Sequence, residues 1–219
     1  MWKNWVRHVL NKYGYELVRV PDPVMVLRQE HAYFARLYDS IRSIDGDIVE
    51  CGVGRGHSLF SIVRLAFREG RSRRIWGFDS FEGFPEPSVH DQSIRNPKKG
   101  DWNRSTPESI MKLLAQHQLD LDRLTLVKGF FSESLKNYQG PSVAFLHLDV
   151  DLYDSYKTCL EFFWPRITPG GVVLFDEYKG RGQLVKFPGA AKAIDEYFGE
   201  QKRFIRVDTS VERYYIYKQ

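Results

Sequence analysis

Cysteine is scarce in this 219-residue chain, and a long apolar run is missing from it. The two cysteines, Cys51 and Cys159, stand far apart, with no cysteine or histidine near them in a metal-ligand pattern. This spacing argues against a disulfide framework and a zinc site, and it suits a reducing compartment. No apolar stretch reaches the roughly 20 residues of a membrane span, and the start lacks the features of a signal peptide. We therefore expect a cytoplasmic protein without stable membrane insertion.

A large excess of one charge is also lacking. The chain carries 32 basic and 28 acidic residues, a net charge of +4. Its densest basic group is Arg68, Arg71, Arg73 and Arg74, which stands where a helix is expected to end. Cations stabilise that end of a helix dipole. A nucleic-acid partner would require a larger basic block, so we expect none.

The N-terminal segment has one apolar helical face, formed by Trp2, Trp5, Val6, Val9 and Leu10. A face of this kind, with basic residues beside it, can lie on a membrane surface or pack against protein. We favour packing on the chain's own domain or on a sister subunit, which makes a homodimer a further expectation.

Short apolar strands alternate with helical patterns through the rest of the chain. Strands are expected at 47–51, 74–79, 124–129, 143–149 and 171–175, helices at 29–44, 59–67, 108–117, 153–164 and 190–198, and a closing antiparallel pair at 204–207 and 214–217. Because the central strands are apolar throughout, the pattern predicts a doubly wound α/β fold with a mostly parallel, seven-stranded, Rossmann-like sheet. Ligands bind such sheets beyond the carboxyl ends of the strands.

The first strand ends in a glycine-rich turn. Glu50 stands in the strand, and Gly52, Gly54 and Gly56 follow it. Glycine lets the backbone pass close to a ligand. The Gly-x-Gly-x-Gly spacing is tighter than the Gly-x-Gly-x-x-Gly of dinucleotide folds. With the acid before it, this spacing favours a turn around S-adenosylmethionine, although a purely structural turn is the alternative.

Two further strand ends complete the predicted cofactor site. Asp79 ends the second strand, where a carboxylate can accept hydrogen bonds from both ribose hydroxyls. Gly129 and Phe130 follow the third strand and offer an apolar wall to an adenine ring. The candidate cofactor-binding residues are Glu50, Gly52, Gly54, Gly56, Ser58, Asp79, Ser80, Gly129, Phe130 and Asp149.

Carboxylates follow two of the later strands. Asp149 and Asp151 come after one strand, and Asp176 and Glu177 come after the next. Clustered negative charge is costly unless a cation lies among the acids. Oxygen ligands favour Mg²⁺ or another divalent cation over zinc. The alternative is that Asp151 or Asp154 caps the following helix and faces solvent.

The stretch from 80 to 107 has no hydrophobic period, and its length inside a compact domain is typical of a lid or binding loop. We expect the lid at about 81–106. His90 lies within it and is a candidate general base. His147, inside an apolar strand, is expected to be a buried histidine that supports the site.

These motifs resemble the macrocin O-methyltransferase-like family of class I S-adenosylmethionine-dependent methyltransferases, which act in macrolide, aminocoumarin and deoxysugar pathways. The resemblance covers residues 47–198 and is carried by 47–53, 77–85, 148–155, 169–178 and 188–195. It implies S-adenosyl-L-methionine at the turn 50–56 with Asp79. It also implies a magnesium ion held by Asp149, Asp176 and Glu177, with Asp151 as the general base.

One departure from the family affects this site. The family usually has two aspartates where this chain has Asp176 and Glu177, so the geometry of the metal site differs by one methylene. Some members carry a histidine base in the lid, so Asp151 and His90 are both candidate catalytic residues. On this basis we expect an N-terminal helical segment at 1–45 and a methyltransferase domain at 46–219.

The predicted function is metal-assisted O-methylation of a hydroxyl on a sugar or natural-product-like small molecule. Three alternatives stay open: a nicotinamide oxidoreductase, a metal-independent methyltransferase, and a non-catalytic nucleoside-binding module. A phosphate-bearing acceptor such as a nucleotide sugar, or a glycosylated metabolite, would suit a scattered set of basic residues, namely Arg55, Lys98, Lys99, Arg104, Lys179 and Arg181.

Overall fold

A single seven-stranded sheet forms the centre of the computed structural model, which describes residues 23–119, 121–180 and 182–219. The strands are β1 (Asp47–Cys51), β2 (Ile75–Asp79), β3 (Leu124–Lys128), β4 (Val143–Leu148), β5 (Ile167–Phe175), β6 (Arg206–Asp208) and β7 (Arg213–Tyr217), in the order β3-β2-β1-β4-β5-β7-β6. β1 to β5 are parallel, β7 runs antiparallel to β5, and β6 antiparallel to β7. This confirms the doubly wound, mostly parallel sheet and its closing antiparallel pair.

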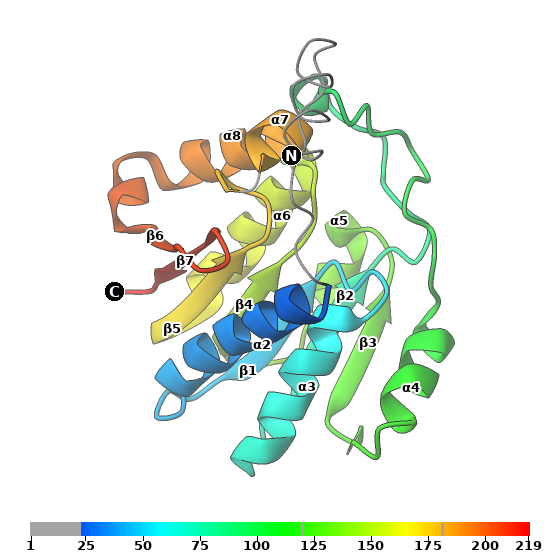
Figure 1. Ribbon diagram of the computed structural model, residues 1–219, viewed down its shortest axis with the longest axis vertical. Coiled ribbons are helices and arrows are strands. Elements are labelled where there is room, and N and C mark those ends of the chain that lie inside the picture. The colour runs from blue at the N-terminus through cyan, green and yellow to red at the C-terminus, as the bar shows by residue number, and fades with distance from the viewer. Residues whose placement is uncertain (1–22, 120, 181) are drawn as a thin grey trace, which may run out of the picture.

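Helices cover both faces of the sheet (Figure 1). They are α2 (Pro23–Ser40) and α3 (His57–Glu69) on one face, α6 (Tyr153–Phe163) and α8 (Pro188–Phe198) on the other, α4 (Pro107–Ala115) beside β3, and the short α5 (Phe131–Ser134) and α7 (Gln183–Lys186). Neighbouring strand residues serve opposite faces: Ile48 packs in the core with α2 and α3, and Val49 in the core with α6 and α8. Both are fully buried, which is why the strands are apolar at every position.

One of the arginines predicted to lie at a helix end, Arg73, binds carbonyls in a turn of the same chain. Arg73 is 5% exposed and forms an ion pair with Glu69, with 2.9 Å between Nε and Oε2. Its Nη2 donates to the carbonyl of Ile41 and its Nη1 to the carbonyl of Gly46. These bonds satisfy carbonyls between α2 and β1 that would otherwise be buried without a donor.

Two elements, α2 and β5, differ from the prediction by four or more residues at an end. The helix predicted at 29–44 runs from Pro23 to Ser40, and it can begin at Pro23 because proline has no N–H to lose in the first turn of a helix. β5 begins at Ile167 rather than at 171, because it continues through two glycines. There the Gly170 N–H donates to the Lys218 carbonyl and the Lys218 N–H to that of Gly171.

The described part of the N-terminal segment is α2, whose residues Phe34, Leu37 and Tyr38 pack into the sheet core. The predicted apolar face formed by Trp2, Trp5, Val6, Val9 and Leu10 lies outside the described residues. No helix in the part of the chain that the structure describes is long and apolar enough to cross a membrane.

The predicted lid, residues 81–106, is described throughout and contains one regular element, the 3₁₀ helix η1 (Val89–Asp91). It leaves the end of β2, passes α7 and leads into α4 (Figure 1). The Ser93 hydroxyl donates to the Lys186 carbonyl at 2.6 Å, so the segment is attached to α7.

Candidate active site

A cavity of about 630 Å³ lies at the carboxyl ends of the parallel strands. Its walls come from the turn after β1, the end of β2, the lid, α7 and the loops after β3, β4 and β5. Ten predicted site residues line it: Gly52, Gly54, Ser58, Asp79, Ser80, Phe130, Asp149, Asp151, Asp176 and Glu177. The cavity therefore lies at the carboxyl ends of the strands, where the sequence predicted that ligands bind.

Four predicted site residues do not line this cavity. Glu50 is fully buried, and its Oε1 lies 2.8 Å from Nδ1 of His147 on the neighbouring strand. Gly56 is the N-cap of α3, and the Gly129 N–H donates to the Asp79 carbonyl. Each of these residues thus contacts a neighbouring strand or helix and not the cavity.

His90, the fourth residue, has its ring centroid 4.5 Å from that of Tyr153. Its ring packs against the start of α6 instead of forming the cavity wall. The prediction of His90 as general base therefore has no support from the geometry, since a base must reach the proton that it removes.

The glycine turn and Asp79 form one unit. Gly52 has φ +88°, and a Cβ built there would lie 1.7 Å from the carbonyl oxygen of Asp149. Only glycine fits this position. Asp79 Oδ2 accepts the Gly54 N–H at 2.8 Å, and its Oδ1 accepts the Phe81 N–H at 2.7 Å. These bonds hold the carboxylate at the cavity wall, and each oxygen keeps a lone pair for a further donor.

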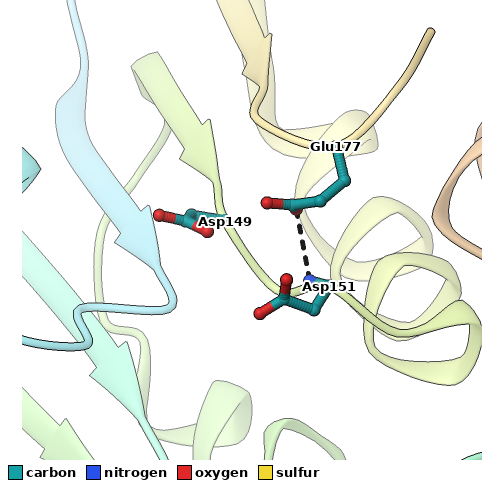
Figure 2. A group of neighbouring side chains, drawn as sticks. All are labelled: Asp149, Asp151 and Glu177. Carbon is teal, nitrogen blue, oxygen red and sulfur yellow. Dashed lines mark hydrogen bonds between the residues drawn. The ribbon is translucent and has the colours of Figure 1, made fainter. Parts of the chain in front are cut away.

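Three carboxylates gather beside this unit. Asp149, Asp151 and Glu177 each offer an oxygen, and these atoms lie within 4.8 Å of one another. The side chains come from the loops after β4 and β5 and face a shared space (Figure 2). The Asp151 N–H donates to Glu177 Oε2 at 3.2 Å, and the Tyr156 hydroxyl lies 2.9 Å from the same oxygen.

Burial and mutual repulsion disfavour the ionised form of these three carboxylates. Burial, followed by the charges of neighbouring acids, raises the pKa of Asp149 and Glu177 well above the usual range. Burial and the charge of Asp176 raise the pKa of Asp151 to about 7. A divalent cation would stabilise the ionised carboxylates, and a donor set made only of oxygens fits Mg²⁺, Mn²⁺ or Ca²⁺.

Asp176, predicted as a metal ligand, lines the cavity and forms an ion pair with Arg213. Arg213 Nη1 lies 2.7 Å from Asp176 Oδ2 and donates to the Asp176 carbonyl at 2.6 Å. Burial lowers the pKa of Arg213, but the charges of Asp176, Glu177 and Asp149 outweigh burial and raise it. The carboxylates that the structure groups together therefore include Asp151 in place of Asp176.

The alternative that Asp151 or Asp154 caps α6 is wrong. The N-cap of α6 is Leu152, whose side chain cannot accept a hydrogen bond. Asp151 instead adopts φ +59°, a left-handed conformation that aspartate tolerates better than most residues. This turn directs the residue toward the cavity, which it lines.

Basic and aromatic side chains also line the cavity. Arg95 and Arg104 place their guanidinium carbons 5.7 and 5.1 Å from the ring centroid of Trp102, and Arg55 and Lys186 complete the basic part of the wall. Arg95 Nη1 also lies 3.5 Å from Asp101 Oδ2, within the lid. Arg95, Trp102 and Lys186 were not predicted as cavity residues; the one signal for them in the sequence is the tryptophan within the polar lid.

The other predicted phosphate-binding residues lie elsewhere. Lys98 and Lys99 line a separate groove on the lid, and Lys179 Nζ lies 3.5 Å from Asp195 Oδ1. Arg181 lies outside the described residues. Of the predicted set, Arg55 and Arg104 thus remain in the cavity.

The sheet order, the glycine turn with Asp79 and the acids at the ends of β4 and β5 define a Rossmann-like fold of the methyltransferase type. The solved structure of CalS11, a calicheamicin methyltransferase, has a TM-score of 0.75 and 26% identity, covering 85% of this chain and 77% of that one. The O-methyltransferase NovP has a TM-score of 0.71 and 22% identity, covering 87% and 80%. Below 25% identity, the second likeness concerns the fold alone.

The chain belongs to the macrocin-O-methyltransferase (TylF) family, whose model matches residues 25–209. It is 34% identical over 140 residues to 8-demethyl-8-(2,3-dimethoxy-alpha-L-rhamnosyl)-tetracenomycin-C 4'-O-methyltransferase of Streptomyces olivaceus, covering 62% of this chain and 54% of that protein. It is 27% identical over 161 residues to demethyldecarbamoylnovobiocin O-methyltransferase of Streptomyces niveus, covering 71% and 59%. The matched segments thus span little more than half the length of these relatives.

Proposed function

We propose that this protein transfers the methyl group of S-adenosylmethionine to a hydroxyl of a sugar, with a divalent cation held by Asp149, Asp151 and Glu177. The observation that carries this proposal is the contact between Gly52 and the Asp149 carbonyl. It joins the turn suited to the methyl donor to the acids suited to the cation, and both open into one cavity. Family membership supports the same reaction.

Each part of the donor would meet a group of matching chemistry. The Asp79 carboxylate would accept the ribose hydroxyls through its remaining lone pairs, and Phe130 would cover the adenine ring. The first backbone N–H groups of α3 follow Gly56, which as a glycine offers them no side-chain cap. They and the Ser58 hydroxyl would bind the carboxylate of the methionine part, as helix N-termini bind anions.

The cation, when bound, would stabilise the developing charge on the acceptor oxygen. Asp149, Asp151 and Glu177 would supply the ligand oxygens, and Tyr156 would orient Glu177. Asp151, with a pKa of about 7, also suits a base near neutral pH. Of its two roles, ligand and base, we favour ligand, because its oxygen lies within 4.8 Å of the ligand oxygens of the other two acids.

The acceptor is proposed to be a sugar attached to a nucleoside diphosphate or to a metabolite. CalS11 is described as a TDP-rhamnose 3'-O-methyltransferase, and the tetracenomycin relative is a rhamnosyl 4'-O-methyltransferase by name. In this chain Arg104 and Lys186 would bind a diphosphate, and Trp102 would contact a ring of the acceptor. A cytoplasmic location and a homodimer remain expectations that accompany this proposal.

A metal-independent methyltransferase is the second candidate. The observation that favours it is the Arg213–Asp176 ion pair, which already supplies one cation beside the acids. The two candidates differ in whether Mg²⁺ changes the reaction.

The experiment is calorimetric titration with S-adenosylhomocysteine, followed by methyl transfer to TDP-rhamnose with Mg²⁺ or with EDTA. We expect micromolar binding, weakened on the order of 10- to 100-fold in Asp79→Asn, since hydrogen bonds to a charged group contribute about 1.5–3 kcal/mol. Asp39→Asn, an exposed acid on α2, is the matched control. Absence of binding in the wild-type protein would sink the methyltransferase proposal, and turnover unchanged in EDTA would select the metal-independent one.

A further inference from the structure

A buried aspartate in the lid contacts the acid-bearing turn of the site. Asp91 is 2% exposed and closes η1. Its Oδ2 accepts the N–H and the hydroxyl of Ser88 at 2.8 and 2.7 Å, within the lid. Its Oδ1 accepts the N–H of Tyr153 at 2.8 Å, on α6. One carboxylate thus ties the lid to the first residue of the helix that follows Asp151.

This bond replaces the missing cap of α6. The N-cap residue Leu152 has no side-chain acceptor, so the Tyr153 N–H would otherwise be an unsatisfied donor at the helix start. The preceding turn is tight and unfavourable for most residues: Asp151 has φ +59°, and the Leu152 N–H lies 2.6 Å from the Val150 carbonyl. Such a conformation persists only where surrounding contacts fix it.

Two further contacts enclose Asp91. A Cβ at Gly189, near the start of α8, would lie 2.0 Å from Asp91 Oδ1, so glycine is required there to admit the carboxylate. The His90 ring packs on the Tyr153 ring beside it. Asp91 is therefore seated between the lid, α6 and α8, although it does not line the cavity itself.

We propose that Asp91 is a positioning residue, which holds from the lid the turn that presents Asp151 to the cation. Loss of the Tyr153 bond would let residues 149–153 relax, and Asp151 would no longer lie beside Asp149 and Glu177. The lid and the cation site would then be coupled through one carboxylate. The metal part of this inference rests on the proposed function; the structural part does not.

The test compares the wild-type chain with Asp91→Ala, Asp91→Asn, Ser88→Ala and Gly189→Ala. Amide hydrogen exchange of residues 149–156 without metal reports the turn, Mn²⁺ titration reports the cation site, and trypsin cleavage at Arg95 or Arg104 reports the lid. We expect Asp91→Ala to speed exchange in the turn and to weaken Mn²⁺ binding about 10- to 100-fold, as loss of groups that orient metal ligands does.

The other variants separate positioning from lid attachment. Asp91→Asn keeps an oxygen for the Tyr153 N–H and should restore most of the Mn²⁺ affinity. Ser88→Ala should speed lid cleavage with Mn²⁺ affinity unchanged. Gly189→Ala should mimic Asp91→Ala, although alanine is favoured over glycine in a helix.

If amide exchange of residues 149–156 in Asp91→Ala were as slow as in the wild-type chain, the inference would be overturned. This holds even if trypsin cleaved the lid of the variant faster. A wild-type chain that binds no Mn²⁺ would instead count against the metal site. In that case the exchange data alone still decide whether Asp91 holds the turn.

Discussion

Arg213 and Asp176 form a partly buried ion pair across the end of the sheet, with side chains 15% and 18% exposed. Arg213 comes from β7 and Asp176 from the loop after β5, so the antiparallel pairing of these two strands brings them together. The pair places one fixed positive charge against a group of acids that otherwise repel one another.

Replacing Arg213 should therefore be costly. Arg213→Gln is expected to lower the free energy of unfolding by about 3 kcal/mol, because it leaves Asp176 without its partner among other acids. Denaturant unfolding measures this loss. Arg42→Gln, which removes an exposed pair with Asp39, should change stability by less than about 0.5 kcal/mol. Equal effects of the two changes would show that the Arg213 pair has no special role.

The ligand set can be read from single isosteric changes. Asp149→Asn, Asp151→Asn and Glu177→Gln are each expected to weaken Mn²⁺ binding at least tenfold, whereas Asp176→Asn should have the smaller effect, because Asp176 pairs with Arg213. Calorimetric titration measures the four affinities. A larger loss for Asp176→Asn than for Asp151→Asn would restore the set implied by the family resemblance and leave Asp151 as the base.

Stability without metal should fall as pH rises through the range set by Asp151. Its pKa is raised to about 7 in the folded chain, against about 4 when unfolded, so the folded state binds more protons between these values. The wild-type chain should thus lose stability relative to Asp151→Asn between about pH 4 and pH 7, and added Mg²⁺ should remove the loss. Thermal unfolding at the two pH values measures it; a difference independent of pH contradicts the raised pKa.

The basic and aromatic part of the cavity should act on the acceptor alone. Trp102→Ala and Arg104→Ala are expected to raise the KM for TDP-rhamnose about tenfold while leaving the affinity for S-adenosylhomocysteine unchanged. Steady-state kinetics and calorimetry give the two values. Lys99→Ala, on the separate lid groove, is the matched control. A parallel loss of cofactor affinity would place Trp102 in the donor site instead.

Local sequence determined much of this site. The apolar strands and the glycine turn are local patterns, and parallel strands bring their carboxyl ends to one edge, so Asp79, Asp149 and Glu177 were predictable as neighbours. The contact between Glu50 and His147 follows once β1 and β4 are paired in the sheet. Glu50 is the register partner of His147, and side chains of register partners lie on the same face of a sheet.

Contacts that depend on tertiary packing were not predictable. Arg213 reaches Asp176 across 37 positions through the pairing of β5 and β7, which no local pattern reveals. Asp91 reaches Tyr153 across 62 positions from a segment without hydrophobic period. The acceptor at the start of α6 was not predictable for the same reason, because it comes from the lid and not from the residues that flank the helix.

Gly52 brings the glycine turn after β1 into direct contact with the acid-bearing loop after β4. Its α-carbon faces the Asp149 carbonyl with no room for a methyl group, and the Asp149 N–H donates to the Cys51 carbonyl at 3.0 Å. A side chain at position 52 would push apart β1 and β4 at the point where both halves of the site begin. The proposed methyl-donor and cation sites would thus share one backbone wall, so a small shift of either strand end would affect both sites.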